Sequence, residues 1–241
     1  MFCDKHLQAL RFRIFSDEHI NIKMIKQIIF TLLLFLFSIY SINAQQNSGN
    51  SSAVNSDSTS AELSFEADAF YYIMPDEDNT TTLIGTADHK ALHLEARYNY
   101  EDKNTFSFFG GYNFETGKEI VLNLTPMAGF AVGNINGIIP GLEISLTWGI
   151  FDYYSESEYI FDFEGKENDY FYIWTELGIS PFDNFRAGAV ANRTLLYQSD
   201  REFESGAFVQ YSFRNIKAMI YYFNPLSKDN SYLIPTLGIE F

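Results

Sequence analysis

The feature that most constrains this chain is a two-residue alternation of apolar and polar side chains. The segment 138–150 carries Ile, Pro, Leu or Trp at every even position, and Gly, Glu, Ser or Thr at every odd position from 141. Because successive side chains of a β-strand point to opposite faces, this period predicts strands with one apolar and one polar face. After Ile42, no apolar stretch approaches the roughly 20 residues that a membrane-spanning helix needs. The sequence therefore predicts an all-β chain.

Ten segments with this alternation follow one another, separated by turn residues. Most have about the 9 to 11 residues that a tilted strand needs to cross the hydrocarbon layer of a membrane. An even number of strands brings both ends of a barrel to the same side. The predicted strands are 63–73, 91–100, 105–114, 120–131, 138–150, 170–180, 185–197, 204–213, 216–223 and 232–241.

The predicted connections differ in length in a regular way. Two of those that follow odd-numbered strands are long, 74–90 and 151–169. Short turns on one side and mostly longer loops on the other are typical of barrels that cross a membrane. The connections that follow even-numbered strands are short: Glu101–Asn104, Val132–Gly137, Pro181–Asn184 and Arg214–Asn215.

The composition of the two strand faces decides between a membrane barrel and a soluble one, since both show the same period. Followed through all ten segments, the apolar face carries one charged residue, Arg193, and the polar face is mostly small and neutral. Aromatic residues fall at the strand ends, with Trp148 at a predicted outer end and Tyr98 and Phe106 at predicted inner ends. These features favour a membrane barrel, with a soluble periplasmic ligand-binding barrel as the alternative.

The last predicted strand, Tyr232–Phe241, ends on an aromatic carboxy-terminal residue. This pattern resembles the insertion signal of small outer-membrane β-barrel proteins of Gram-negative bacteria. The resemblance implies an antiparallel up-and-down transmembrane barrel over residues 62–241, with about ten strands and a range of 8 to 12. It also implies a monomer in the bacterial outer membrane that contacts its lipid and lipopolysaccharide and is inserted by the barrel-assembly machinery.

The amino-terminal part has the features of a secretory signal. Lys26 precedes an apolar core from Ile28 to Ile42, and Asn43-Ala44 follow it. We therefore interpret residues 24–44 as a cleaved signal peptide and residues 1–23 as an upstream extension from a misassigned start. An amino-terminal membrane anchor is the alternative. Residues 45–61 are rich in Ser and Asn and predict a flexible leader.

The chain is strongly acidic and almost free of cysteine. Asp and Glu total 31 against 16 Lys and Arg, which gives a net charge of −15. This charge disfavours nucleic acid as a partner. The one cysteine, Cys3, precedes the predicted signal, so no disulfide or cysteine metal ligand is expected in the barrel.

The polar face of the predicted strands carries titratable side chains that we expect in the lumen. They suggest two interpretations, a hydrogen-bonded polar plug or a narrow polar passage that favours cations, because acids outnumber bases. The predicted lumen cluster is Glu66, Asp68, His93, Glu95, Arg97, Glu143, Glu176, Arg186, Lys217 and Glu240.

Catalysis and metal binding receive little support. His93, Glu95 and Ser107 could be drawn as an acyl-transfer triad, but they match no hydrolase signature. The acidic loop 151–169 could hold calcium, yet its spacing falls short of an EF-hand. We therefore expect no catalytic, cofactor-binding or metal-binding residues and no cofactor. The predicted function is a non-enzymatic surface protein or porin-like narrow channel, with a lipid-active outer-membrane hydrolase as a further alternative.

Overall fold

The computed structural model describes residues 63–75, 78–196, 201–227 and 230–241. The expected extension 1–23, signal peptide 24–44 and leader 45–61 lie outside these residues. Thirteen strands form one sheet, and a three-residue 3-10 helix, η1, precedes the ninth strand. The elements are β1 (Leu63–Tyr72), β2 (Thr80–His89), β3 (Leu92–Tyr98), β4 (Phe106–Tyr112), β5 (Phe114–Thr116), β6 (Ile120–Val132), β7 (Gly137–Trp148), β8 (Phe151–Asp162), η1 (Lys166–Asn168), β9 (Tyr170–Phe182), β10 (Phe185–Leu196), β11 (Arg201–Phe213), β12 (Ile216–Phe223) and β13 (Tyr232–Glu240).

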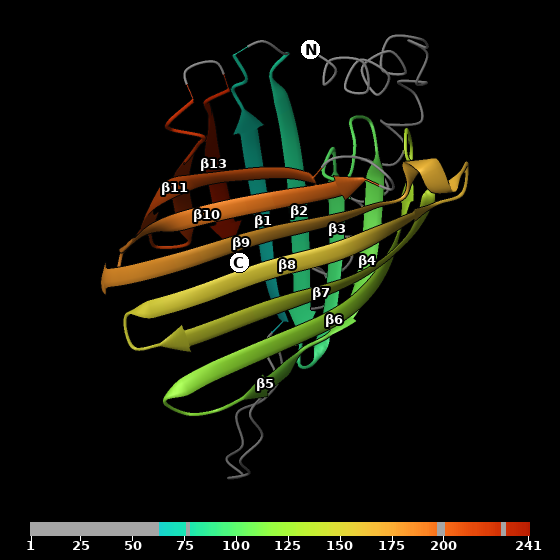
Figure 1. Ribbon diagram of the computed structural model, residues 1–241. Coiled ribbons are helices and arrows are strands. Elements are labelled where there is room, and N and C mark those ends of the chain that lie inside the picture. The colour runs from blue at the N-terminus through green and yellow to red at the C-terminus, as the bar shows by residue number, and fades with distance from the viewer. Residues whose placement is uncertain (1–62, 76–77, 197–200, 228–229) are drawn as a thin grey trace, which may run out of the picture. The chain divides into compact units, whose positions relative to one another are not determined.

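The sheet closes on itself to form an antiparallel barrel (Figure 1). β1 pairs with both β2 and β13, and β4 closes the ring by pairing with β6. β4 and β5 lie end to end along the same edge of β6, interrupted at Asn113. They occupy one position in the ring, so the barrel has 12 strand positions built from 13 strands.

The predicted all-β antiparallel barrel is confirmed, and its 12 strand positions lie at the upper limit of the predicted range of 8 to 12 and not at the central count of ten. The two missing strands are β2 and β8, which occupy the predicted long loops 74–90 and 151–169. β2 escaped detection because Leu83 is the one large apolar side chain on its outward face, between Thr81 and Gly85. β8 resembles a solvated acidic loop in sequence because it carries four acidic residues, Asp152, Glu156, Glu158 and Asp162.

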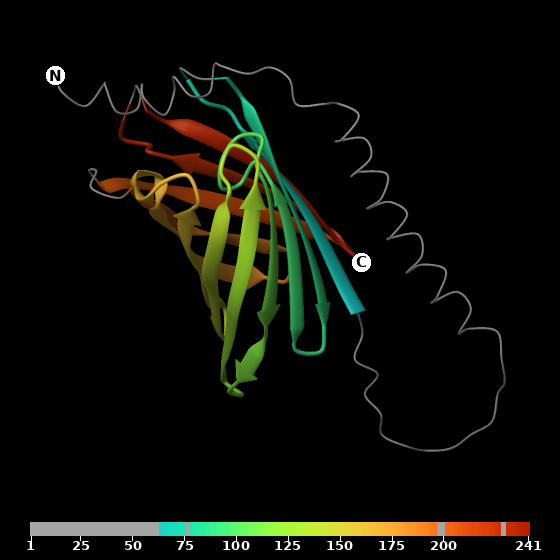
Figure 2. The same cartoon turned by 90° about the vertical axis from the view of Figure 1, so that its right-hand side faces the viewer.

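The missing strand β2 also changes the end of the barrel at which the following connections lie. The connections between β2 and β8 in sequence lie at the end opposite to the predicted one. Both ends of the described barrel, Leu63 and Phe241, lie at one end, which we call the turn end (Figure 2). The connections at this end are 90–91, 117–119, 149–150, 183–184 and 214–215. The opposite end, the loop end, carries the connections 99–105, 133–136 and 163–169, together with the described residues 73–75, 78–79, 224–227 and 230–231 of two further connections.

The predicted sides of the connections 101–104 and 132–137 are therefore wrong, and so are those of the aromatic residues next to them. Tyr98 and Phe106 lie at the loop end, where their ring centroids are 4.5 Å apart, and Trp148 lies at the turn end. The predicted sides of 181–184 and 214–215 are correct, because the second missing strand restores the original alternation.

The outer face of the barrel is apolar. Its large side chains are about half exposed, with relative exposures between 47% and 58% for Leu83, Leu94, Phe130, Ile138, Leu177, Val209, Ile220 and Leu237. A barrel in water would place such residues inside, so the outward apolar face fits a hydrocarbon surrounding. Across the described residues, no helix has the length and apolar character needed to cross a membrane.

The interior contains a second apolar region, which we call the apolar layer. Two buried clusters form it, and Tyr172 packs against both of them. Phe223 ends β12 and Tyr232 begins β13, so the layer lies in the half of the lumen next to the loop end. Its members are Phe109, Met127, Ala131, Ile139, Ile160, Tyr170, Trp174, Val190, Phe208, Tyr221, Phe223, Tyr232 and Ile234.

Candidate functional site

A buried arginine is the centre of the largest polar group in the lumen. Arg97 points inward from β3, and four carboxylates lie within 4 Å of its guanidinium nitrogens. Its side chain is fully buried. The four partners and their shortest N to O distances are Glu95 at 2.8 Å, Glu101 at 3.6 Å, Glu156 at 2.6 Å and Glu158 at 3.0 Å. We call Arg97 and these carboxylates the Arg97 network.

The Arg97 network joins the apolar layer. The guanidinium carbon of Arg97 lies 4.3 Å from the ring centroids of both Tyr100 and Phe109, and Phe109 belongs to the layer. Tyr100 donates a hydrogen bond to Glu156 Oε2 at 3.1 Å. Because β3 and β8 are separated by several strands on either side of the ring, the network spans the lumen between them.

One positive charge among four buried carboxylates leaves a negative excess. Glu101, in the connection before β4, accepts a 2.6 Å hydrogen bond from Ser107 Oγ, and burial raises the pKa of its carboxyl. Uncompensated buried carboxylates are costly, so such a group gains free energy from a proton or from a further cation. The negative excess of the Arg97 network therefore favours cations in this part of the lumen and disfavours anions.

Two further ion-pair groups lie near the turn end. Arg186 on β10 contacts Asp152 on β8 at 2.5 Å and Glu176 on β9 at 2.6 Å. The guanidinium of Arg186 also lies 4.5 Å from the ring centroid of Phe208. Tyr221 donates a 2.8 Å hydrogen bond to Glu176, which connects this group to the apolar layer.

The seam between the first and last strands is held by a lysine. Glu66 and Glu240 lie directly opposite each other on β1 and β13, where their like charges would repel. Lys217 Nζ, on β12, lies 2.5 Å from Glu66 Oε1 and 2.6 Å from Glu240 Oε1. Asp68 follows on the same inward face of β1, opposite Gly238.

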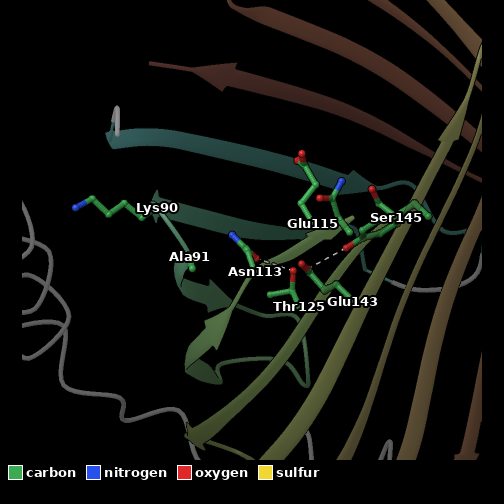
Figure 3. Close-up of a pocket in the computed structure, with 9 residues that line it drawn as sticks. Lys90, Ala91, Asn113, Glu115, Thr125, Glu143 and Ser145 are labelled. Carbon is green, nitrogen blue, oxygen red and sulfur yellow. Dashed lines mark hydrogen bonds between the residues drawn. The ribbon is translucent and has the colours of Figure 1, made fainter. Parts of the chain in front are cut away.

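A cavity of about 400 Å³ opens near the turn end, beside the turn 90–91. Asn113 Nδ2 donates to Asp88 at 2.7 Å, and Thr125 Oγ1 donates to Asn113 at 2.7 Å. Figure 3 shows Asn113, Thr125 and Glu143 close together, with Lys90 extending away from them. The lining residues are Lys90, Ala91, Asn113, Glu115, Asn123, Thr125, Glu143, Ser145 and Tyr154.

The structure places all ten residues of the predicted lumen cluster on inward faces, but it divides them among separate groups. Glu95 belongs to the Arg97 network, Glu176 and Arg186 form the second group, and Lys217 joins Glu66 and Glu240. The sequence interpretation missed several of their partners. The missed partners are Asp88, Glu101, Asp152, Glu156 and Glu158.

The triad drawn from the sequence is not assembled. Ser107 lies opposite Arg97 in the pairing of β3 with β4, whereas His93 lies opposite Gly111. Four residues of strand separate the two positions, which corresponds to about 13 Å. His93 Nδ1 lies 2.9 Å from Asp88 Oδ1 instead. The acidic segment 151–169, considered above for calcium, does not form one loop, since Asp152, Glu156 and Glu158 point into the lumen from β8.

Comparisons with known proteins show a fold and no close relative. A scan against models of protein families and a search of curated proteins found no match. Among solved structures, the chain resembles the KdgM porin with 10% identity and a TM-score of 0.55, covering 73% of this chain and 98% of that one. The NanC porin gives 11% identity and a TM-score of 0.51, with coverages of 73% and 98%.

A second structure of the KdgM porin, in complex with disordered oligogalacturonate, gives 9% identity and a TM-score of 0.56. It covers 73% of this chain and 99% of that chain. At these identities the similarity shows the fold alone. The chain therefore has the fold of small outer-membrane porins, as the resemblance of its terminal strand indicates.

Proposed function

We propose that this protein is a non-enzymatic outer-membrane barrel with a narrow, cation-preferring passage that is closed on its loop side. The observation that carries this proposal is the layered lumen. An acid-rich polar half next to the turn end meets the apolar layer and the Arg97 network in the other half. A hydrated ion has no polar partners within an apolar layer, so passage requires the aromatic side chains to move.

The outer face supports the proposed location. Its apolar side chains fit the hydrocarbon of the outer membrane, and the short-turn end with both barrel termini fits the periplasmic side. The expected partners remain outer-membrane lipid, lipopolysaccharide and, during insertion, the barrel-assembly machinery. Among the described strands, only the short β5, which pairs with β6 alone, leaves one edge unpaired, so the closed ring fits a monomer.

Acidic oligosaccharides do not fit this lumen. One solved structure of the KdgM porin holds oligogalacturonate, which is a polyanion. In this chain, Arg97 faces four carboxylates, and Lys217 and Arg186 face two each. A polyanion would be repelled by this excess, so we propose small cations or neutral solutes as the permeants.

Conductance across planar bilayers tests the proposal. We expect the wild-type barrel to show rare, small openings with a reversal potential that indicates cation preference in a KCl gradient. The Phe223→Ala variant removes a fully buried ring that lies 5.4 Å from the Trp174 ring and 5.0 Å from the Tyr232 ring. We expect this variant to conduct more often and with larger currents.

The matched control is Tyr222→Ala. Tyr222 is the neighbouring aromatic residue on β12 but faces outward, with 41% exposure. Its removal should leave the currents as in the wild type. Large, steady currents through the wild-type barrel, or anion preference, would contradict the proposed closed passage.

A further inference from the structure

His93 is a buried histidine with one unsatisfied nitrogen. Its side chain is 6% exposed, and Nδ1 is engaged by Asp88 at 2.9 Å. Its other ring nitrogen, Nε2, is buried without a hydrogen-bond partner and lies 3.7 Å from Glu95 Oε2. A buried polar atom without a partner costs free energy, so its position next to carboxylates calls for an occupant.

Glu143 completes a group of three potential ligands. One ligand atom each of His93, Glu95 and Glu143 lies within 4.8 Å of the others. Zinc ligands bind at about 2.0 to 2.2 Å, so two of them can be at most about 4.4 Å apart. Closing this difference requires small side-chain movements, and Glu143 borders the open cavity.

We propose that His93, Glu95 and Glu143 form a binding site for a divalent transition-metal ion of the Zn²⁺ class. An imidazole nitrogen with two carboxylates suits such an ion, whereas Ca²⁺ and Mg²⁺ prefer oxygen ligands alone. The fourth position would face the cavity, which supplies room for water and a path from the turn end.

The residues around this group have the arrangement that orients metal ligands. Asp88 accepts from His93 Nδ1 and so directs the lone pair of Nε2 into the site, as in carboxylate–histidine–zinc arrangements. Asp88 is itself held by Asn113. Arg97 donates two hydrogen bonds to Glu95, and Tyr154 donates one to Glu143 Oε1 at 3.0 Å.

The local charge balance supports a cation at this position. The carboxylates of Asp88, Glu95 and Glu143 surround His93. A fourth carboxylate, that of Glu156, lies close to Glu143, because both are within hydrogen-bond reach of the Tyr154 hydroxyl. Arg97 is the one cation that contacts this group within the described residues, and it is shared among four carboxylates. A divalent ion would reduce the excess and leave the four ion pairs of Arg97 in place.

Calorimetric titration of the refolded full chain with Zn²⁺, without a histidine tag, tests this site. We expect saturable binding of one equivalent in the wild type and its loss in His93→Gln and Glu143→Gln. Asp88→Asn should weaken the affinity on the order of 10- to 100-fold, because it removes the carboxylate that orients His93 but leaves the three ligands in place. Co²⁺ should give the visible absorption of a low-symmetry site in the wild type and should give none in His93→Gln and Glu143→Gln.

The matched control is His89→Gln. His89 ends β2, is exposed and lies on the opposite face from Asp88. It should bind Zn²⁺ as the wild type does. Folding is checked by heat-modifiable migration in gels, and Glu143→Gln supplies the test if His93→Gln fails to refold. Absence of saturable binding in the wild type overturns the proposal. Equal binding in the wild type and either ligand variant also overturns it.

Discussion

Arg97 Nη1 donates a hydrogen bond to Glu158 Oε2 at 3.0 Å, and this bond joins β3 to β8 across the lumen. The two side chains are among the most deeply buried in the described residues. The bond links one predicted strand to a segment that the sequence interpretation treated as a loop. It also places the positive charge of the network next to the aromatic rings that close the lumen.

Replacing Arg97 should destabilise the barrel strongly. Arg97→Met keeps the length of the side chain but leaves four buried carboxylates without their cation, which should cost about 3 to 5 kcal/mol in the free energy of unfolding. Urea unfolding of the refolded protein, followed by tryptophan fluorescence, measures this. Arg214→Met, in an exposed turn, should change the value by less than about 0.5 kcal/mol. Equal effects of both changes would argue against a structural role of the network.

Gly129 is required for the position of Phe109. A Cβ atom at 129 would overlap the ring of Phe109 and lie 2.6 Å from the carbonyl oxygen of Phe108. Phe109 is buried under Arg97, so its ring has little room to move. We expect Gly129→Ala to lower the free energy of unfolding by about 1 to 3 kcal/mol. The same urea experiment measures it.

Gly110→Ala is the control for this prediction. No atom lies within 4 Å of a Cβ atom at Gly110, which faces outward on the strand that carries Phe109. The control should unfold close to the wild type. A loss of the same size in both variants would show that strand propensity, and not the contact with Phe109, causes the effect.

The alternation of side chains contains enough information for most of the fold. The alternating position of a residue along a strand determines whether its side chain faces inward. The amino-acid sequence alone therefore places Glu143, and the residues two positions before and after it, in the lumen. The alternation does not reveal a strand whose outward residues are small, such as Thr81 and Gly85 of β2. In β8, Tyr153 and Tyr159 alternate with acids in a regular way, although the many acids of this segment favour a loop. That alternation is the signal that could have identified this strand.

The site was less predictable than the fold. Its ion pairs join residues far apart in sequence, such as Arg97 and Glu158, and no local pattern specifies which strands face each other across a ring. The position of Lys217 between Glu66 and Glu240 likewise depends on closure of β1 against β13. The apolar layer was missed for another reason. Its residues, such as Ile234 and Phe223, occupy the face that the sequence interpretation assigned to polar contacts.

The stability of the protein should depend on pH through Glu101. Burial raises the pKa of this carboxyl, so the folded protein holds its proton more strongly than the unfolded chain. The stability that it contributes is greatest below the unfolded pKa of about 4.5 and falls as the pH rises through the folded value. Glu101→Gln should remove this decrease. Its unfolding midpoint in urea should therefore change less between pH 4 and pH 8 than that of the wild type.

An exposed glutamate provides the comparison for the pH experiment. Glu119, in the connection between β5 and β6, is exposed, so Glu119→Gln should keep the pH dependence of the wild type. If Glu101→Gln and the wild type change in parallel with pH, another buried carboxylate of the network dominates the titration.

The apolar outer face predicts how strongly a charge at each depth disturbs the barrel. Leu177 lies at the centre of β9 and points outward, and Phe182 ends the same strand at the turn end. Leu177→Arg should cost about 2 to 4 kcal/mol in lipid vesicles, and Phe182→Arg about 0 to 1 kcal/mol, because an arginine near the interface reaches the headgroups. Urea unfolding in vesicles measures both. Similar costs would indicate that the outer face meets water or protein and not hydrocarbon.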